Sequence, residues 1–167
     1  MSSMSKNSAA VVGVGRTGAG KSSLLNLIAG YPAFQESAQA ASCTQAVSEV
    51  KVTIENNFEV TLIDTPGFFD TNGAEADQAN MNLITEHLKT LENGINAIVI
   101  CISWGDVRFD TNFQKIIKYL YSFFQDGHIW FQVCFVVTNS QSKEELISRR
   151  IEKMTKGPDS LAAKMQL

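Results

Sequence analysis

The chain has 167 residues, a formal net charge of -3 and a hydrophobic content of 44%. This length fits one domain, and the apolar content is enough to form a buried core. The acidic balance gives no reason to expect nucleic acid or an anionic membrane surface as a partner. We therefore expect no nucleic-acid binding, and any anionic ligand must be held by local groups.

The cysteines and the first residues bear on the compartment. Cys101 and Cys134 lie within apolar runs, and Cys43 is distant from both, which predicts free, buried thiols in a reducing compartment. The first ten residues lack the apolar segment of a signal peptide, and no apolar run approaches the ~20 residues of a transmembrane helix. We expect a cytoplasmic protein.

The first part of the chain is predicted to form a strand, a helix and a hairpin. Residues 1–8 are small and polar and are expected to be a disordered tail, and residues 9–14 are a short apolar strand. Residues 21–29 are typical of a helix. Residues 50–54 and 58–63 alternate apolar and polar side chains around an Asn-Asn turn, which predicts an antiparallel hairpin.

Helices and strands alternate in the second part of the chain. Residues 81–91 repeat apolar side chains at helical spacing, and residues 95–102 (INAIVICI) are a nearly continuous apolar run, typical of a strand covered on both faces. We expect a helix over residues 113–124, a strand over residues 129–137 and a helix over residues 143–156.

This order of elements predicts an α/β fold, a three-layer sandwich with a mostly parallel sheet and one antiparallel strand. We expect the domain to span residues 9–167. Only residues 161–167 remain after the last helix and its Gly-Pro stop, too few for another strand and helix.

The stretch GRTGAGKSS, residues 15–23, joins the first strand to the first helix and fits the phosphate-loop pattern GxxxxGK[ST]. Its glycines let backbone N–H groups turn toward a phosphate, and the helix N-terminus adds a positive dipole. Lys21 would reach the β- and γ-phosphates, and the Ser22 hydroxyl would bind Mg²⁺. A chance match in a flexible turn is the alternative. The candidate nucleotide-binding residues here are Gly15, Arg16, Thr17, Gly18, Ala19, Gly20, Lys21, Ser22 and Ser23.

A second motif, DTPG at residues 64–67, follows the strand over residues 58–63. In this topology it lies beside the phosphate loop, where Asp64 would hold Mg²⁺ and the Gly67 N–H would contact the γ-phosphate. An ATPase of this superfamily more often has an acidic pair here, so the motif favours a GTPase switch. Thr44 would close over Mg²⁺ and the γ-phosphate when GTP is bound, or is an ordinary loop hydroxyl.

Five stretches together resemble the avirulence-induced and immunity-associated GTPases, septin-like relatives of the plastid-import GTPases: VVGVGRTGAGKSSLLNLIAG, SCTQAV, VTLIDTPGFFDT, DVRFDTNFQ and FVVTNSQSKEE. The resemblance covers roughly residues 9–150. It implies a P-loop NTPase fold of the Ras-like G-domain type, here without the last strand and helix, and a switch that uses GTP/GDP and Mg²⁺. It also implies a homodimer or homo-oligomer across the nucleotide face, and recruitment to intracellular membranes through C-terminal segments.

The chain departs from a Ras-type enzyme at the position that orients the attacking water. A glutamine follows DxxG in such enzymes, whereas Phe68 stands here, so we expect slow hydrolysis that a partner assists. Arg108, in the stretch VRFDT that is similar to an extra box of the family, is a candidate for an arginine supplied in trans, or else a surface charge. Arg16 is a second candidate, with a solvated loop residue as the simpler interpretation. The candidate catalytic residues are Lys21, Thr44, Gly67 and Arg108.

A second departure concerns the base. Thr138, Asn139 and Gln141 follow the predicted strand where the family has T-x-x-D, so Gln141 replaces the aspartate that accepts two N–H groups of guanine. The lost charge-assisted pair would cost about 1–3 kcal/mol. A nucleotide-locked scaffold without useful hydrolysis and an adenine-nucleotide ATPase remain as alternatives. His87 and His128 are interpreted as structural.

Overall fold

The computed structural model describes residues 8–36, 46–54, 57–68, 74–91, 94–106, 111–124 and 131–139. The strands in these residues are β1 (Ser8–Gly15), β2 (Ser48–Ile54), β3 (Phe58–Asp64), β4 (Ala97–Ser103) and β5 (Val133–Thr138). The helices are α1 (Lys21–Ala29), α2 (Ala74–Lys89) and α3 (Thr111–Phe124), with a short 3-10 helix, η2 (Trp104–Asp106), after β4.

The five strands form one sheet with the order β2-β3-β1-β4-β5. Strands β1, β3, β4 and β5 run parallel, and β2 pairs antiparallel with β3. The predicted sheet, mostly parallel with one antiparallel strand, is therefore confirmed. Because parallel strands end at the same edge of a sheet, the carboxyl ends of β1, β3, β4 and β5 lie along one edge.

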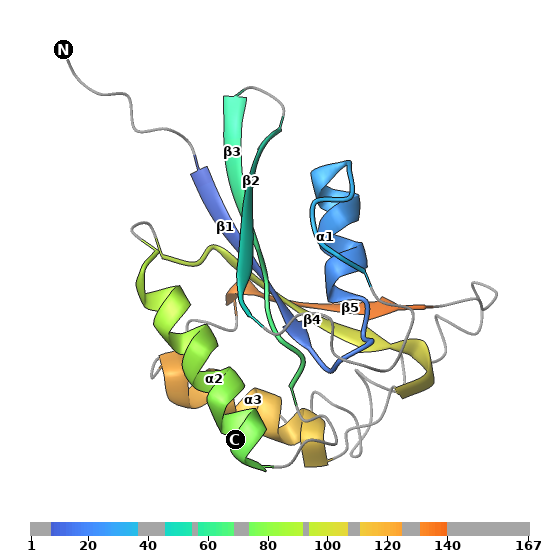
Figure 1. The fold of residues 1–167 in the computed structure, drawn as a ribbon, viewed down its shortest axis with the longest axis vertical. Helices are drawn as coiled ribbons and strands as arrows, with labels where there is room; N and C mark the ends of the chain where they lie inside the picture. Colours follow the sequence, from blue (N-terminus) through green and yellow to red (C-terminus); the bar gives the residue numbers. More distant parts are fainter. Residues whose placement is uncertain are drawn as a thin grey trace.

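Helices cover both faces of the sheet, with α1 on one face and α2 and α3 on the other (Figure 1). Val12 and Val14 of β1 belong to the core that α2 and α3 close, together with Ile84 and Ile116. On the opposite face, a Cβ atom at Gly13 would lie 3.2 Å from Cδ1 of Leu25 in α1. The missing side chain thus lets α1 pack close to the sheet.

Strand β4 shows the double-sided burial that its sequence predicts. Ile98 and Ile100 join the core beneath α2 and α3, whereas Val99 and Cys101 pack on the α1 face with Ala19. Alternate side chains of this strand therefore contribute to two separate cores, which explains a run without polar residues.

Several element boundaries differ from the sequence predictions. Strand β4 begins at Ala97 rather than at residue 95. Asn96 pairs with Ala10 partly through its side chain: its backbone N–H donates to the Ala10 carbonyl (3.0 Å), but its side-chain Oδ1, and not its backbone carbonyl, accepts from the Ala10 N–H (2.8 Å). Helix α2 already begins at Ala74, and the acidic residues of its first turn suit a helix N-terminus. Strand β5 begins at Val133, so residues 131 and 132 of the predicted strand do not belong to it, and residues 129 and 130 lie outside the described residues. The helix predicted over residues 143–156 lies outside the described residues.

The prediction of buried thiols is correct for Cys101 and wrong for Cys134. Both are free cysteines, but Cys101 is buried and Cys134 is exposed. Strand β5 is the last strand of the described sheet, so a strand flanks it on one side only. An apolar run at the edge of a sheet therefore does not imply full burial. Cys43 lies outside the described residues.

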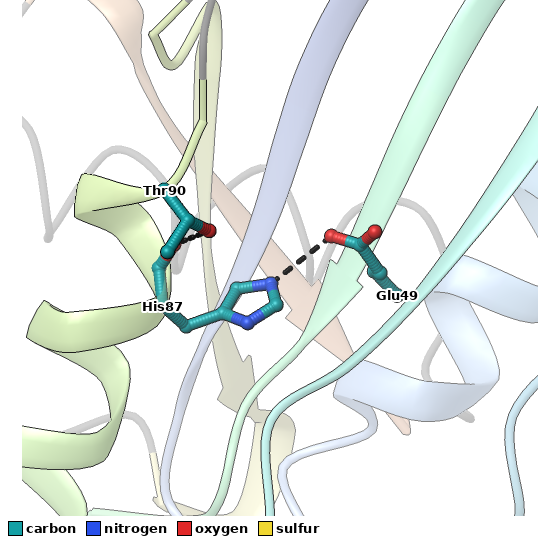
Figure 2. A network of polar contacts seen from close by, with 3 residues as sticks. All are labelled: Glu49, His87 and Thr90. Carbon is teal, nitrogen blue, oxygen red and sulfur yellow. Dashed lines mark hydrogen bonds and ion pairs between the residues drawn. The ribbon is translucent and has the colours of Figure 1, made fainter.

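His87 makes a contact between two elements that are far apart in the sequence (Figure 2). Its Nε2 atom lies 3.1 Å from Oε2 of Glu49, so the end of α2 is tied to the start of β2. The Thr90 hydroxyl donates to the His87 carbonyl (2.7 Å) and closes the last turn of the helix. This position is consistent with the structural role expected for His87.

None of the described helices has the length and apolar character needed to cross a membrane.

Candidate functional site

The loop between β1 and α1 has the conformation that its glycines allow. Gly15 and Gly20 have positive φ angles of 152° and 80°, which other residues rarely adopt. A Cβ atom at Gly15 would also lie 2.5 Å from the carbonyl oxygen of Cys101, so the loop can leave β1 at this point only through a glycine. Helix α1 begins at Lys21, and its positive N-terminus therefore adjoins the loop.

Lys21 lies across this loop. The residue is 6% exposed, and its Nζ atom donates hydrogen bonds to the carbonyl oxygens of Gly15 (3.3 Å) and Arg16 (3.1 Å). A buried ammonium group needs such acceptors, because its desolvation is otherwise very costly. The loop thus holds one positive charge beside a helix N-terminus, an arrangement that favours a polyanion.

Ser22 and Asp64 meet next to the loop. The Ser22 hydroxyl donates a 2.5 Å hydrogen bond to Oδ2 of Asp64, which ends β3 and is 1% exposed. The neighbouring Thr65 hydroxyl donates to the Gly13 carbonyl (2.7 Å) and fixes the end of β3 against β1. The sheet therefore brings together two side chains that are 42 residues apart in sequence.

The chemistry of this pair fits a magnesium ion shared with a phosphate. Mg²⁺ prefers oxygen ligands and is usually bound by one or two side chains together with phosphate oxygens and water. Ser22 and Asp64 offer a hydroxyl and a carboxylate oxygen at one point. In the described residues, no group of three His, Cys, Asp or Glu side chains could hold a metal ion by itself. A metal held by Ser22 and Asp64 would take these two oxygens together with phosphate oxygens and water.

The segment after Asp64 packs directly on the loop. A Cβ atom at Gly67 would overlap the Thr17 hydroxyl and would lie 2.6 Å from the Thr17 backbone nitrogen. Only a glycine can approach the loop this closely. The motifs at residues 15–23 and 64–67 are thus in van der Waals contact, as expected for residues that bind the same ligand.

Phe68 does not offer a side chain to the site. Its ring is fully buried in the core with α2 and α3, with its centroid 5.5 Å from that of Tyr119. Its backbone N–H donates to the Gly15 carbonyl (3.1 Å), and Phe68 pairs with Arg16 as an isolated β-bridge. The position that carries the water-orienting glutamine in Ras-type enzymes is used here to anchor the backbone.

The end of β5 also contacts the loop. The Thr138 hydroxyl donates to the carbonyl oxygen of Ala19 (2.6 Å) and lies 3.3 Å from that of Ile102. Asn139 has a positive φ of 54°, and its side-chain amide donates to the Ser103 hydroxyl (3.4 Å). The start of the predicted base-binding segment is therefore tied to the phosphate loop and to the end of β4.

A polar cluster that joins α1 to the segment after it was not expected from the sequence. The Ser23 hydroxyl donates to Oε2 of Glu36 (2.6 Å), and the buried Asn26 amide donates to Oε1 of Glu36 (2.7 Å) and to the Phe34 carbonyl (2.9 Å). The hydrogen bonds from Ser23 and Asn26 lower the pKa of Glu36. Ser23, a candidate phosphate ligand, thus bonds to the chain that follows α1. The signal in the sequence that could have indicated this cluster is Asn26, a polar residue on the buried side of α1.

The described residues bring most of the predicted site together. The loop contacts Asp64 through Ser22, Gly67 through Thr17, and Thr138 through Ala19. Three other predicted site residues, Thr44, Arg108 and Gln141, lie outside the described residues.

Residues 9–161 match the model of the AIG1 family. The chain belongs to the AIG1 family. Among similar proteins, GTP-binding protein A of Dictyostelium discoideum is 34% identical over 113 residues, which are 68% of this chain and 24% of that protein. GTPase IMAP family member 8 of Mus musculus is 30% identical over 118 residues, 70% of this chain and 17% of that protein. The family resemblance predicted from the motifs is confirmed, and the chain spans at most about a quarter of these two relatives.

Solved structures of P-loop GTPases share the fold of this AIG1 family member. Toc33 from Arabidopsis thaliana in complex with GDP and Mg²⁺ has a TM-score of 0.75 at 23% identity, over 96% of this chain and 64% of Toc33. Era in complex with MgGDPNP and a segment of 16S ribosomal RNA has a TM-score of 0.65 at 18% identity, over 93% of this chain and 49% of Era. At such low identity the likeness is one of fold.

Proposed function

We propose that this protein is a guanine-nucleotide switch that binds GTP and GDP with Mg²⁺ and hydrolyses GTP slowly. The observation that carries the proposal is the position of Lys21 across the glycine loop, with the Ser22 and Asp64 oxygens beside it. A magnesium-bound polyphosphate requires three kinds of group at one point: a positive side chain, a helix N-terminus, and two oxygen ligands for the metal.

Each of these groups has a separate task in the proposed site. The backbone N–H groups of the loop and the Lys21 ammonium bind the β- and γ-phosphates, and Ser22 and Asp64 hold the metal, directly or through water. A Mg²⁺ ion held there would neutralise part of the negative charge of the phosphates. Gly67, in contact with the loop at Thr17, places its N–H near the γ-phosphate and so distinguishes a triphosphate from a diphosphate.

The names of the relatives support guanine as the base. The names of GTP-binding protein A and GTPase IMAP family member 8 refer to GTP. Structures of Toc33 are known in complex with GDP and with GMPPNP. At the end of β5, where the proposed base-binding segment begins, Thr138 contacts the loop and Asn139 contacts the end of β4. Gln141 in place of aspartate would weaken the discrimination against adenine rather than abolish nucleotide binding.

The position of Phe68 supports a proposal that hydrolysis depends on a second copy of the chain. Because its ring is buried against Tyr119, this position has no group that can orient the attacking water. For atToc33 and psToc159, dimerization is described as important for GTPase activity, and a Toc33 mutant with one arginine replaced by alanine is described as dimerization deficient. We propose a homodimer across the nucleotide face, with Arg108 as the candidate residue supplied in trans and Arg16 as the second candidate.

Displacement of a fluorescent GDP analogue tests the proposed ligand. GTP and GDP should displace the label at concentrations at least about tenfold lower than ATP, since the base site retains some hydrogen-bonding groups. Equal displacement by ATP would favour the adenine-nucleotide alternative. Tight binding without measurable hydrolysis at any protein concentration would instead favour a nucleotide-locked scaffold.

A further inference from the structure

The peptide unit between Gly67 and Phe68 is held at both of its polar atoms. The Asn80 side-chain amide, on α2, donates to the Gly67 carbonyl oxygen (3.1 Å), and the Phe68 N–H donates to the Gly15 carbonyl oxygen (3.1 Å). One hydrogen bond thus ties this peptide to α2 and the other ties it to the phosphate loop.

The side chain that follows this peptide is fixed as well. The Phe68 ring packs against Tyr119 of α3, and the Tyr119 hydroxyl donates to the Met81 carbonyl (3.0 Å) and lies 2.7 Å from the Thr85 hydroxyl. Phe68 is therefore anchored to α2 and α3 together. The hydrogen bond from Asn80 extends this anchoring to the Gly67 backbone.

A fixed peptide after Gly67 restricts the peptide before it. Peptide units are planar, and the proline ring fixes one torsion of Pro66, so few torsions remain that can turn the Gly67 N–H. A glycine without external contacts would leave these torsions free. The hydrogen bond from Asn80 therefore limits the directions in which the Gly67 N–H can point.

We propose that Asn80 is a positioning residue that orients the Gly67 N–H toward a γ-phosphate and thereby sets the preference of the site for a nucleoside triphosphate over a diphosphate. The proposal rests on the proposed function, in which Gly67 contacts the γ-phosphate. Asn80 is suited to this role because it is half-buried and lies on a helix, which holds its side chain more firmly than a loop would.

The test compares two asparagines of α2, Asn80→Ala and Asn82→Ala. Asn82 is exposed and accepts a hydrogen bond from Gln78 (3.1 Å), so the control also loses one hydrogen bond on the same helix. Dissociation constants for GDP and for a non-hydrolysable GTP analogue are measured with Mg²⁺ present. In Asn80→Ala the ratio of analogue affinity to GDP affinity should fall about three- to tenfold, the effect of one hydrogen bond, and in Asn82→Ala it should not change.

Asn80→Leu provides a second variant, which keeps most of the side-chain volume but has no donor. It should show the same loss of preference, and thermal unfolding of each variant checks that the protein is folded. An unchanged affinity ratio in both folded Asn80 variants would overturn the proposal and leave Asn80 as a stabilising residue. In that case nucleotide binding by the wild type would still support the proposed function, whereas a wild type that binds neither nucleotide would contradict both.

Discussion

The Ser22 hydroxyl donates a 2.5 Å hydrogen bond to the carboxylate of Asp64, and this contact joins the start of α1 to the end of β3. Both groups carry hard oxygen atoms, and both adjoin the loop that holds Lys21. If nucleotide binding depends on a metal ion, we expect that ion to bind at Ser22 and Asp64.

Asp64→Asn should remove most of the effect of Mg²⁺ on GDP affinity. The amide keeps the shape of the side chain but loses the negative charge, so GDP affinity with Mg²⁺ should fall about 10- to 100-fold, whereas affinity in EDTA should change little. Calorimetric titration with and without the metal measures both values. Glu59→Gln, at the opposite end of the same strand, is the control. An Asp64→Asn protein with the metal response of the wild type would argue against a metal site here.

Gly67→Ala should destabilise the protein by overpacking. The added methyl group would overlap Thr17, and the Thr17 backbone nitrogen, 2.6 Å away, cannot move as a side chain could. Such strain costs about 1–3 kcal/mol, which lowers the midpoint of thermal unfolding by several degrees. Gly105→Ala is the matched control, because a Cβ atom added at Gly105 would meet nothing within 4 Å. Equal midpoints for the two variants would mean that the contact between the two motifs is not closely packed.

Arg108→Ala should separate nucleotide binding from turnover. Single-turnover GTP hydrolysis by the wild type should become faster as protein concentration rises, because a second copy completes the site. The variant should bind GDP normally but lose most of this increase, since an arginine supplied in trans contributes about 10³ to 10⁵ in rate. Arg16→Ala is measured beside it to decide between the two candidates. A wild-type rate constant that is independent of concentration would exclude assistance by a second copy.

Cys101 and Cys134 should differ strongly in reactivity toward iodoacetamide. Burial raises the pKa of Cys101 to about 11, and a raised pKa means less of the reactive thiolate at a given pH. At pH 8 only about one Cys101 thiol in a thousand would be ionised, and the side chain is also shielded from solvent. Peptide mapping after a short labelling pulse should find Cys134 modified and Cys101 intact, and denaturant should remove the difference. Similar labelling of both in the folded protein would contradict the buried position of Cys101.

Sequence reasoning succeeded where the signal is local. The glycines and Lys21 of the phosphate loop lie within a few residues of each other, and the alternation in β2 and β3 is visible within each strand. The place of Asp64 at the end of a strand predicted that it lies beside the phosphate loop, because parallel strands end at one edge of the sheet. The structure places it there, in contact with Ser22.

Contacts between distant elements could not be predicted in this way. The pairing of His87 with Glu49 depends on the rotation of α2 over β2, and the hydrogen bond from Asn80 to Gly67 depends on where α2 begins. In the sequence, neither His87 nor Asn80 differs in kind from the other polar residues of α2. The exposure of Cys134 likewise depends on the position of β5 in the sheet, which the composition of the strand does not reveal.

The most direct test of the proposed function is calorimetric titration of the protein with GDP in the presence of Mg²⁺. The wild type should show saturable binding to one site. Lys21→Ala should weaken it about 100-fold or more, because the charge held at the Gly15 and Arg16 carbonyls is lost, and Lys118→Ala, on α3, should bind like the wild type. Absence of GDP binding by the wild type, or undiminished binding by Lys21→Ala, would contradict the assignment of this loop as the phosphate site.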